Sequence, residues 1–72
     1  MTDLYNCRLG EDYMVRDLIL KPSERARLGA LGLVRGARVS VKVRTRGGAI
    51  IQSLGSRVAL SKKLCRRVVL EK

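Results

Sequence analysis

Histidine, tryptophan and phenylalanine are absent from these 72 residues, and proline occurs only once. Histidine is the side chain whose ordinary pKa lies closest to neutral, so the chain has no ordinary general base. Its six acidic residues form no pair at helical spacing that would supply an acid and a base, and no serine has a plausible activating partner. We therefore expect no enzymatic activity and no catalytic residues.

Cysteine is scarce, because Cys7 and Cys65 are the only two in the chain. They do not form a CxxC pair, and without histidine they supply neither a zinc site nor a disulfide framework. Free cysteine behaves as a small buried hydrophobe, so both residues are expected to be reduced core thiols. A redox or metal-binding role for the pair is the alternative. We expect no cofactor and no bound metal.

Long apolar runs are missing as well. No stretch approaches the ~20 apolar residues that cross a bilayer, so no direct membrane insertion is expected. The N-terminus, Met1-Thr2-Asp3-Leu4, has no basic region followed by an apolar run, which predicts a cytoplasmic protein. The length predicts a single domain over residues 1–72. Only Tyr5 and Tyr13 are aromatic, so valine, leucine, isoleucine and alanine must build the core.

Positive charge is abundant: 16 Lys and Arg residues against 6 Asp and Glu give a net charge of +10. This field favours a nucleic acid, an anionic membrane surface or an acidic face of another protein, and the charge does not choose among them. Both tyrosines lie in the N-terminal fifth, which we interpret as far from the basic strand at residues 38–44. Specific nucleic-acid binding is therefore not expected, because single-strand recognition needs aromatic rings on which bases stack.

A short helix is predicted from Lys21-Pro22-Ser23-Glu24 to about Leu31. Ser23 is the expected N-cap, and Glu24 lies where the helix dipole favours an anion. Gly32 is expected to end the helix in the left-handed conformation, with Leu33 packing back on Leu28.

Several segments have the patterns of strands. We expect strands at residues 13–20, 38–44, 49–54 and 68–70, and a helical turn at 61–65 with Leu64 and Cys65 inward. In the second strand Val39, Val41 and Val43 alternate with a cationic face, and Thr45-Arg46-Gly47-Gly48 is a hairpin turn. The next turn is read as Gly55-Ser56, which pairs residue 51 with 60, 53 with 58 and 54 with 57. Exposure of Ile50 and Leu54 would favour a weak homo-oligomer.

This order of elements predicts a mainly β fold: a small SH3-like β-barrel with one short α-helix and a C-terminal helical turn. The run from Arg27-Leu28 through Leu31-Gly32-Leu33 to Gly36, followed by an alternating strand, resembles the signature of the FeoA family. The ending also resembles that family, with Gly47-Gly48, then residues 55–60, then Val68-Val69-Leu70. The resemblance covers nearly the whole chain.

The resemblance implies a non-enzymatic accessory protein of bacterial ferrous iron transport. Its implied partner is the cytoplasmic part of the FeoB-type membrane iron transporter, which it would modulate by protein–protein contact. The alternative is a free-standing basic SH3-like barrel that binds nucleic acid or the ribosome. The expected partner-binding residues are the helix-to-strand corner and the cationic strand face, namely Leu31, Leu33, Arg35, Arg38, Lys42 and Arg44.

Overall fold

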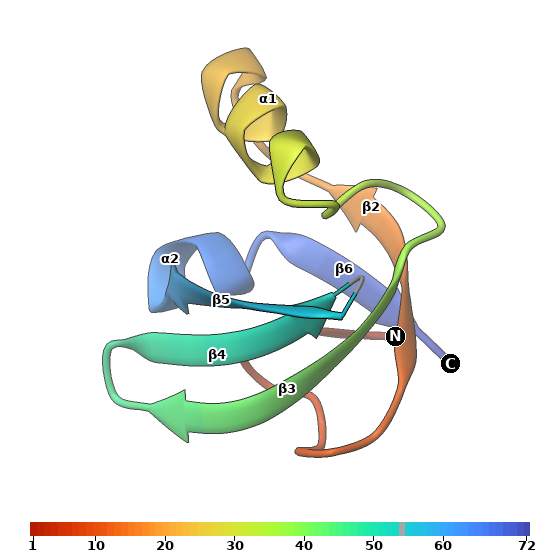
Figure 1. The fold of residues 1–72 in the computed structure, drawn as a ribbon, viewed down its shortest axis with the longest axis vertical. Coiled ribbons are helices and arrows are strands. Elements are labelled where there is room, and N and C mark those ends of the chain that lie inside the picture. The colour runs from red at the N-terminus through yellow and green to blue at the C-terminus, as the bar shows by residue number, and fades with distance from the viewer. Residues whose placement is uncertain (54) are drawn as a thin grey trace.

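The computed structural model describes residues 1–53 and 55–72. Strands dominate, and the two helices lie between them in the chain (Figure 1). In chain order the elements are β1 (Thr2–Asp3), β2 (Tyr13–Leu18), α1 (Pro22–Ala30), β3 (Arg38–Thr45), β4 (Gly48–Ser53), β5 (Ser56–Ser61), α2 (Lys62–Cys65) and β6 (Val68–Glu71).

The strands form one antiparallel sheet in the order β1-β6-β2-β3-β4-β5. The sheet curls around a single core, with α2 beside β4 and β5 and α1 projecting beyond the strands (Figure 1). The hydrogen-bonded sheet does not close into a complete barrel, because β1 and β5 are its two edge strands. The mainly β, SH3-like architecture predicted from the sequence is confirmed. Strand β1 has no counterpart among the predicted strands, since a two-residue strand leaves no alternation to detect. Strand β5 corresponds to the second strand of the hairpin predicted around Gly55-Ser56.

Valine, leucine and isoleucine side chains fill the core, as the shortage of aromatic residues requires. Fully buried members come from strands β2, β3, β4 and β6 and from both helices. Cys7 and Cys65 are buried free thiols, which confirms their core placement. The Cys65 thiol donates to the Leu60 carbonyl at 3.7 Å. Burial raises the pKa of Cys7, and it raises the pKa of Cys65 to about 11.

Helix α1 begins at Pro22, two residues before the start that a Ser23 N-cap would give. Its N-cap is Lys21, not Ser23, and Pro22 occupies the first helical position. Proline suits that position because its missing N–H would have no partner there in any case. The Glu24 carboxylate accepts the Lys21 backbone N–H at 3.0 Å, which is the bond that a capping-box acid makes back to the N-cap, and no side-chain cap of the kind expected from Ser23 is present. Leu28 is the one buried residue of the helix.

The C-terminus of α1 has the predicted glycine cap. Gly32 has a φ of 88°, and its N–H donates to the Gly29 carbonyl at 3.0 Å. The Leu33 N–H donates to the Leu28 carbonyl, also at 3.0 Å, and both of these leucine side chains are in the core. These two bonds are those of a Schellman motif, in which the residue after the glycine turns back onto the helix. The motif sets the direction in which the chain leaves α1 for β3.

Strand β3 departs from the predicted alternation at Lys42. Val41 pairs with Ile51 and Val43 with Ile50, so Lys42 is an extra residue that forms a β-bulge. The predicted valine face is wrong at its third position, because Val43 is 44% exposed while Val39 and Val41 are buried. A bulge of one residue reverses the facing of all later side chains. Arg44 therefore leaves the face that carries Arg38 and Lys42.

The β4–β5 hairpin has a different register from the one predicted. Ile51 pairs with Val58 and Ser53 with Ser56, so the partners are shifted by two residues. An even shift keeps the same side chains on the same face, and Ile51 is fully buried. Ile50 is half-buried. The expectations for Leu54 fall outside the described residues.

Candidate partner-binding surface

The helix-to-strand corner between α1 and β3 divides into buried and exposed residues. Leu33 is fully buried and is part of the core, so its expected contact with a partner does not fit this placement. Leu31 is 40% exposed, and Val34, which the sequence prediction omitted, is 48% exposed. These two apolar side chains form the outer surface of the corner.

Arg35 ties this corner to β2. Its guanidinium lies 3.1 Å from the Asp17 carboxylate in an exposed ion pair. The pKa of Asp17 is lowered, first because its carboxylate accepts the Leu18 backbone N–H at 2.8 Å and then because Arg35 donates to it. The connection is also anchored by backbone bonds, since Val15 donates to the Ala37 carbonyl and accepts the Gly36 N–H. The exposed apolar residues therefore sit on a fixed loop.

Arg38 and Lys42 line an open pocket of about 240 Å³ on the outside of β3 and β4. Ser53 also lines it and is 2% exposed, and among residues 1–53 and 55–72 its hydroxyl has no hydrogen-bond partner. Ser53 pairs directly with the buried Val39 and shares its face, so this hydroxyl is not accessible to a ligand on the outer surface. The pocket can present the two cations Arg38 and Lys42 to a carboxylate. Its remaining lining residues are Asp12, Val39, Ser40, Gln52 and Gly55.

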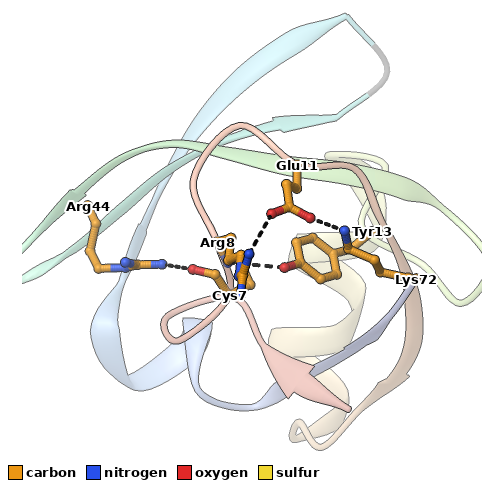
Figure 2. Close-up of polar contacts among 6 residues, drawn as sticks. All are labelled: Cys7, Arg8, Glu11, Tyr13, Arg44 and Lys72. Carbon is orange, nitrogen blue, oxygen red and sulfur yellow. Dashed lines mark hydrogen bonds and ion pairs between the residues drawn. The ribbon is translucent and has the colours of Figure 1, made fainter.

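Arg44 has a different environment from Arg38 and Lys42. Its guanidinium donates to the Cys7 backbone carbonyl, as Figure 2 shows, and lies 5.8 Å from the centre of the Tyr5 ring. Its Nε atom is buried. The side chain therefore clamps the loop after β1 onto β3. The prediction that Arg44 shares one cationic face with Arg38 and Lys42 is wrong, because of the bulge at Lys42.

Tyr5 lies close to basic residues, contrary to the prediction from the sequence. Its hydroxyl donates to the Thr45 carbonyl at 2.8 Å, and the Lys62 ammonium lies 4.9 Å from the ring centre. The Tyr13 ring is buried, with Lys72 5.6 Å from its centre. Both rings therefore already have cations of this chain over them, which leaves them poorly placed to stack on bases.

A second set of polar contacts ties down the loop between β1 and β2. The Arg8 backbone N–H donates to the Tyr13 hydroxyl at 3.1 Å, and Glu11 forms ion pairs with Arg8 and with Lys72 (Figure 2). These contacts join the loop to the C-terminal end of the sheet. Of the two adjacent acids, Glu11 forms these ion pairs, whereas Asp12 borders the pocket on β3.

Residues 1–53 and 55–72 contain no group of three or more His, Cys, Asp or Glu side chains arranged to hold a metal ion. Across the same residues, neither helix has the length and apolar character to cross a membrane. Together, the curled antiparallel sheet and its basic surface define a small mainly β domain of the SH3-like class.

The comparisons identify the family within that class. The model of the FeoA domain family matches residues 2–72, and the chain belongs to this family of small proteins associated with ferrous iron transport. A crystal structure of an iron uptake regulatory protein (FeoA) is 29% identical, with a TM-score of 0.85 over 93% of this chain and 91% of that one. No curated protein sequence matches the chain.

Two solution structures show the same fold at lower identity. The FeoA protein from Chlorobium tepidum is 22% identical, with a TM-score of 0.87 over 96% of this chain and 68% of that one. A FeoA-like protein from Clostridium acetobutylicum is 15% identical, with a TM-score of 0.81 over 97% and 84% of the two chains.

Proposed function

We propose that this protein is a non-enzymatic cytoplasmic accessory of bacterial ferrous iron transport, which modulates a FeoB-type membrane transporter by binding its cytoplasmic part. Membership of the FeoA family supports the link to iron transport. The observation that carries the docking surface is the exposed apolar pair Leu31 and Val34 on the fixed corner, with the pocket of Arg38 and Lys42 on the strand that follows.

The corner and the pocket supply different parts of an interface. Leu31 and Val34 can be desolvated by an apolar partner surface, which is the main source of affinity in protein association. Arg38 and Lys42 select a partner segment that carries carboxylates and accelerate its association. Leu33 and Arg44 support the fold beneath these surfaces and make no contact in this proposal.

Charge reversal at the pocket tests the proposal in cells. We expect Arg38→Glu/Lys42→Glu to reduce FeoB-dependent ferrous iron uptake and to weaken binding to the cytoplasmic part of the transporter about tenfold. The matched control is Lys21→Glu/Arg46→Glu, which changes the net charge by the same amount at two exposed residues outside the pocket. Unchanged uptake in the pocket variant, or an equal loss in the control, would contradict the proposed docking surface.

The alternative, a basic barrel that binds nucleic acid or the ribosome, has less support. The two tyrosine rings that would stack on bases already pack against Arg44, Lys62 and Lys72. A weak homo-oligomer stays a prediction, for which size-exclusion chromatography with light scattering is the direct measurement.

A further inference from the structure

A second concentration of positive charge surrounds α2, away from the corner and the β3 pocket. Four cationic side chains line an open pocket of about 540 Å³, and among residues 1–53 and 55–72 they are its whole lining: Lys62, Lys63, Arg66 and Arg67. The pocket is within the size range of small-molecule sites. In Figure 1, α2 lies on the left of the molecule, and the connection between α1 and β3 lies on the upper right.

These four cations have no carboxylate partner within residues 1–53 and 55–72. The four ion pairs there use Arg8, Arg16, Arg35 and Lys72 as their basic members. Glu24 is an acid that interacts with two of these cations. Its pKa is lowered mainly by the hydrogen bond from the Lys21 backbone N–H, with smaller contributions from Arg67 and Lys63. One carboxylate, already hydrogen-bonded elsewhere, leaves most of this positive charge uncompensated.

The backbone holds the four cations close together in spite of their repulsion. The Ser61 hydroxyl accepts the Leu64 N–H at 3.3 Å at the start of α2, and Leu64 and Cys65 are buried. At the other end, the Ile19 N–H donates to the Arg67 carbonyl at 2.9 Å. Like charges one helical turn apart destabilise a helix, so this arrangement has a cost that a bound anion removes. The pocket is therefore preorganised for negative charge.

We propose that this pocket binds the phosphate chain of a small polyphosphate anion. One phosphate group carries about −1.5 to −2 charges near neutral pH, which neutralises about half of the four cations. Two or three linked phosphates match all four. The two arginines can each engage phosphate oxygens in a bidentate manner, and the two lysines act as point charges.

The same lining indicates which part of the ligand is recognised. Within the part of the chain that the structure describes, no aromatic or apolar residue lines the pocket, so these residues offer no platform for a nucleobase. A free inorganic polyphosphate and a nucleoside triphosphate therefore present equivalent chemistry to it. An open pocket lined by four residues of one short segment suits a compact anion better than an extended nucleic acid or a flat membrane surface, which engage several patches.

Titration of the ¹⁵N-labelled protein followed by NMR tests this proposal at about 0.15 M salt, where long-range charge effects are screened. The ligands are tripolyphosphate, ATP, GTP and inorganic monophosphate. We expect tripolyphosphate and the two nucleotides to shift the amides of residues 61–67 with similar affinity, and monophosphate to bind at least about tenfold more weakly, because it leaves about half the positive charge unmatched.

Paired variants separate a site from general charge. Lys63→Gln/Arg66→Gln removes two charges from the pocket, and Arg38→Gln/Lys42→Gln removes two from β3. We expect the first to weaken tripolyphosphate binding about tenfold and the second less than about twofold, since screening confines the effect to nearby charges. Glu24→Gln should tighten binding, because it removes a carboxylate that interacts with Arg67 and Lys63. Circular dichroism verifies that each variant is folded.

Three results would overturn the proposal. Equal losses in the two double variants would indicate diffuse attraction. Nucleotide binding more than about tenfold tighter than tripolyphosphate binding would show that a base is recognised. If an RNA oligonucleotide or anionic lipid vesicles bind at residues 61–67 and tripolyphosphate does not bind, the surface recognises a large polyanion and not a compact one.

Discussion

Arg44 is the residue whose role in the structure differs most from the role predicted from the sequence, so its replacement gives a sharp test. Arg44→Ala removes a charged hydrogen bond to the Cys7 carbonyl and a cation–π contact with Tyr5. A hydrogen bond from a charged group contributes about 1.5–3 kcal/mol, and an exposed cation–π contact about 0.5–1 kcal/mol. Since the loop can admit water, we expect a loss of about 2 kcal/mol in the free energy of unfolding.

Arg38→Ala is the matched control, because Arg38 is an exposed arginine on the same strand before the bulge. Its replacement should change stability by no more than about 0.5 kcal/mol. The assay is urea denaturation followed by far-ultraviolet circular dichroism. For a domain of this size, 2 kcal/mol corresponds to a fall in Tm of about 8–16 °C. Equal effects of the two substitutions would refute the bulge at Lys42 and the separate role of Arg44.

Two further predictions concern backbone packing and thiol ionisation. A Cβ atom at Gly48 would lie 2.1 Å from the Leu60 carbonyl oxygen, whereas one at Gly47 would meet nothing within 4 Å. Gly48→Ala should therefore lower thermal stability by about 1–3 kcal/mol and Gly47→Ala by less than about 0.5 kcal/mol, and similar melting temperatures would contradict this packing. Burial raises the pKa of Cys65 from its ordinary value of 9.0 to about 11 in the folded state. Because the folded state holds this proton more tightly, its stabilising effect is complete below pH 9 and is lost as the pH rises to about 11. Cys65→Ala should flatten that part of the stability profile relative to the parent protein, and an unchanged profile would refute the contribution.

Local signals in the sequence predicted local structure well. Gly32 between two leucines determined the end of α1, because glycine adopts the positive φ of a Schellman cap at little cost. The burial of Cys7 and Cys65 likewise followed from their apolar neighbours and from the absence of histidine. In both cases the deciding interaction lies within a few residues along the chain.

The errors arose where distant segments meet. The bulge at Lys42 depends on how β3 pairs with β4, and an alternating run of residues gives no sign of an extra one. Tyr5 lies 40 residues from Thr45 in the sequence, yet it donates to that carbonyl. Of the expected contact residues, Leu31, Arg35, Arg38 and Lys42 are on the surface, while Leu33 is in the core and Arg44 acts as a clamp.

The most direct test of the proposed function is an NMR titration of the ¹⁵N-labelled protein with the purified cytoplasmic part of a FeoB-type transporter, at physiological salt. The account predicts saturable binding, with shifts or broadening confined to the amides of residues 31–42 and their neighbours across β4. Absence of binding at about 100 μM partner, where even a transient complex is detectable, would contradict it. A footprint restricted to residues 61–67 would also contradict it, because that surface is assigned to a different ligand.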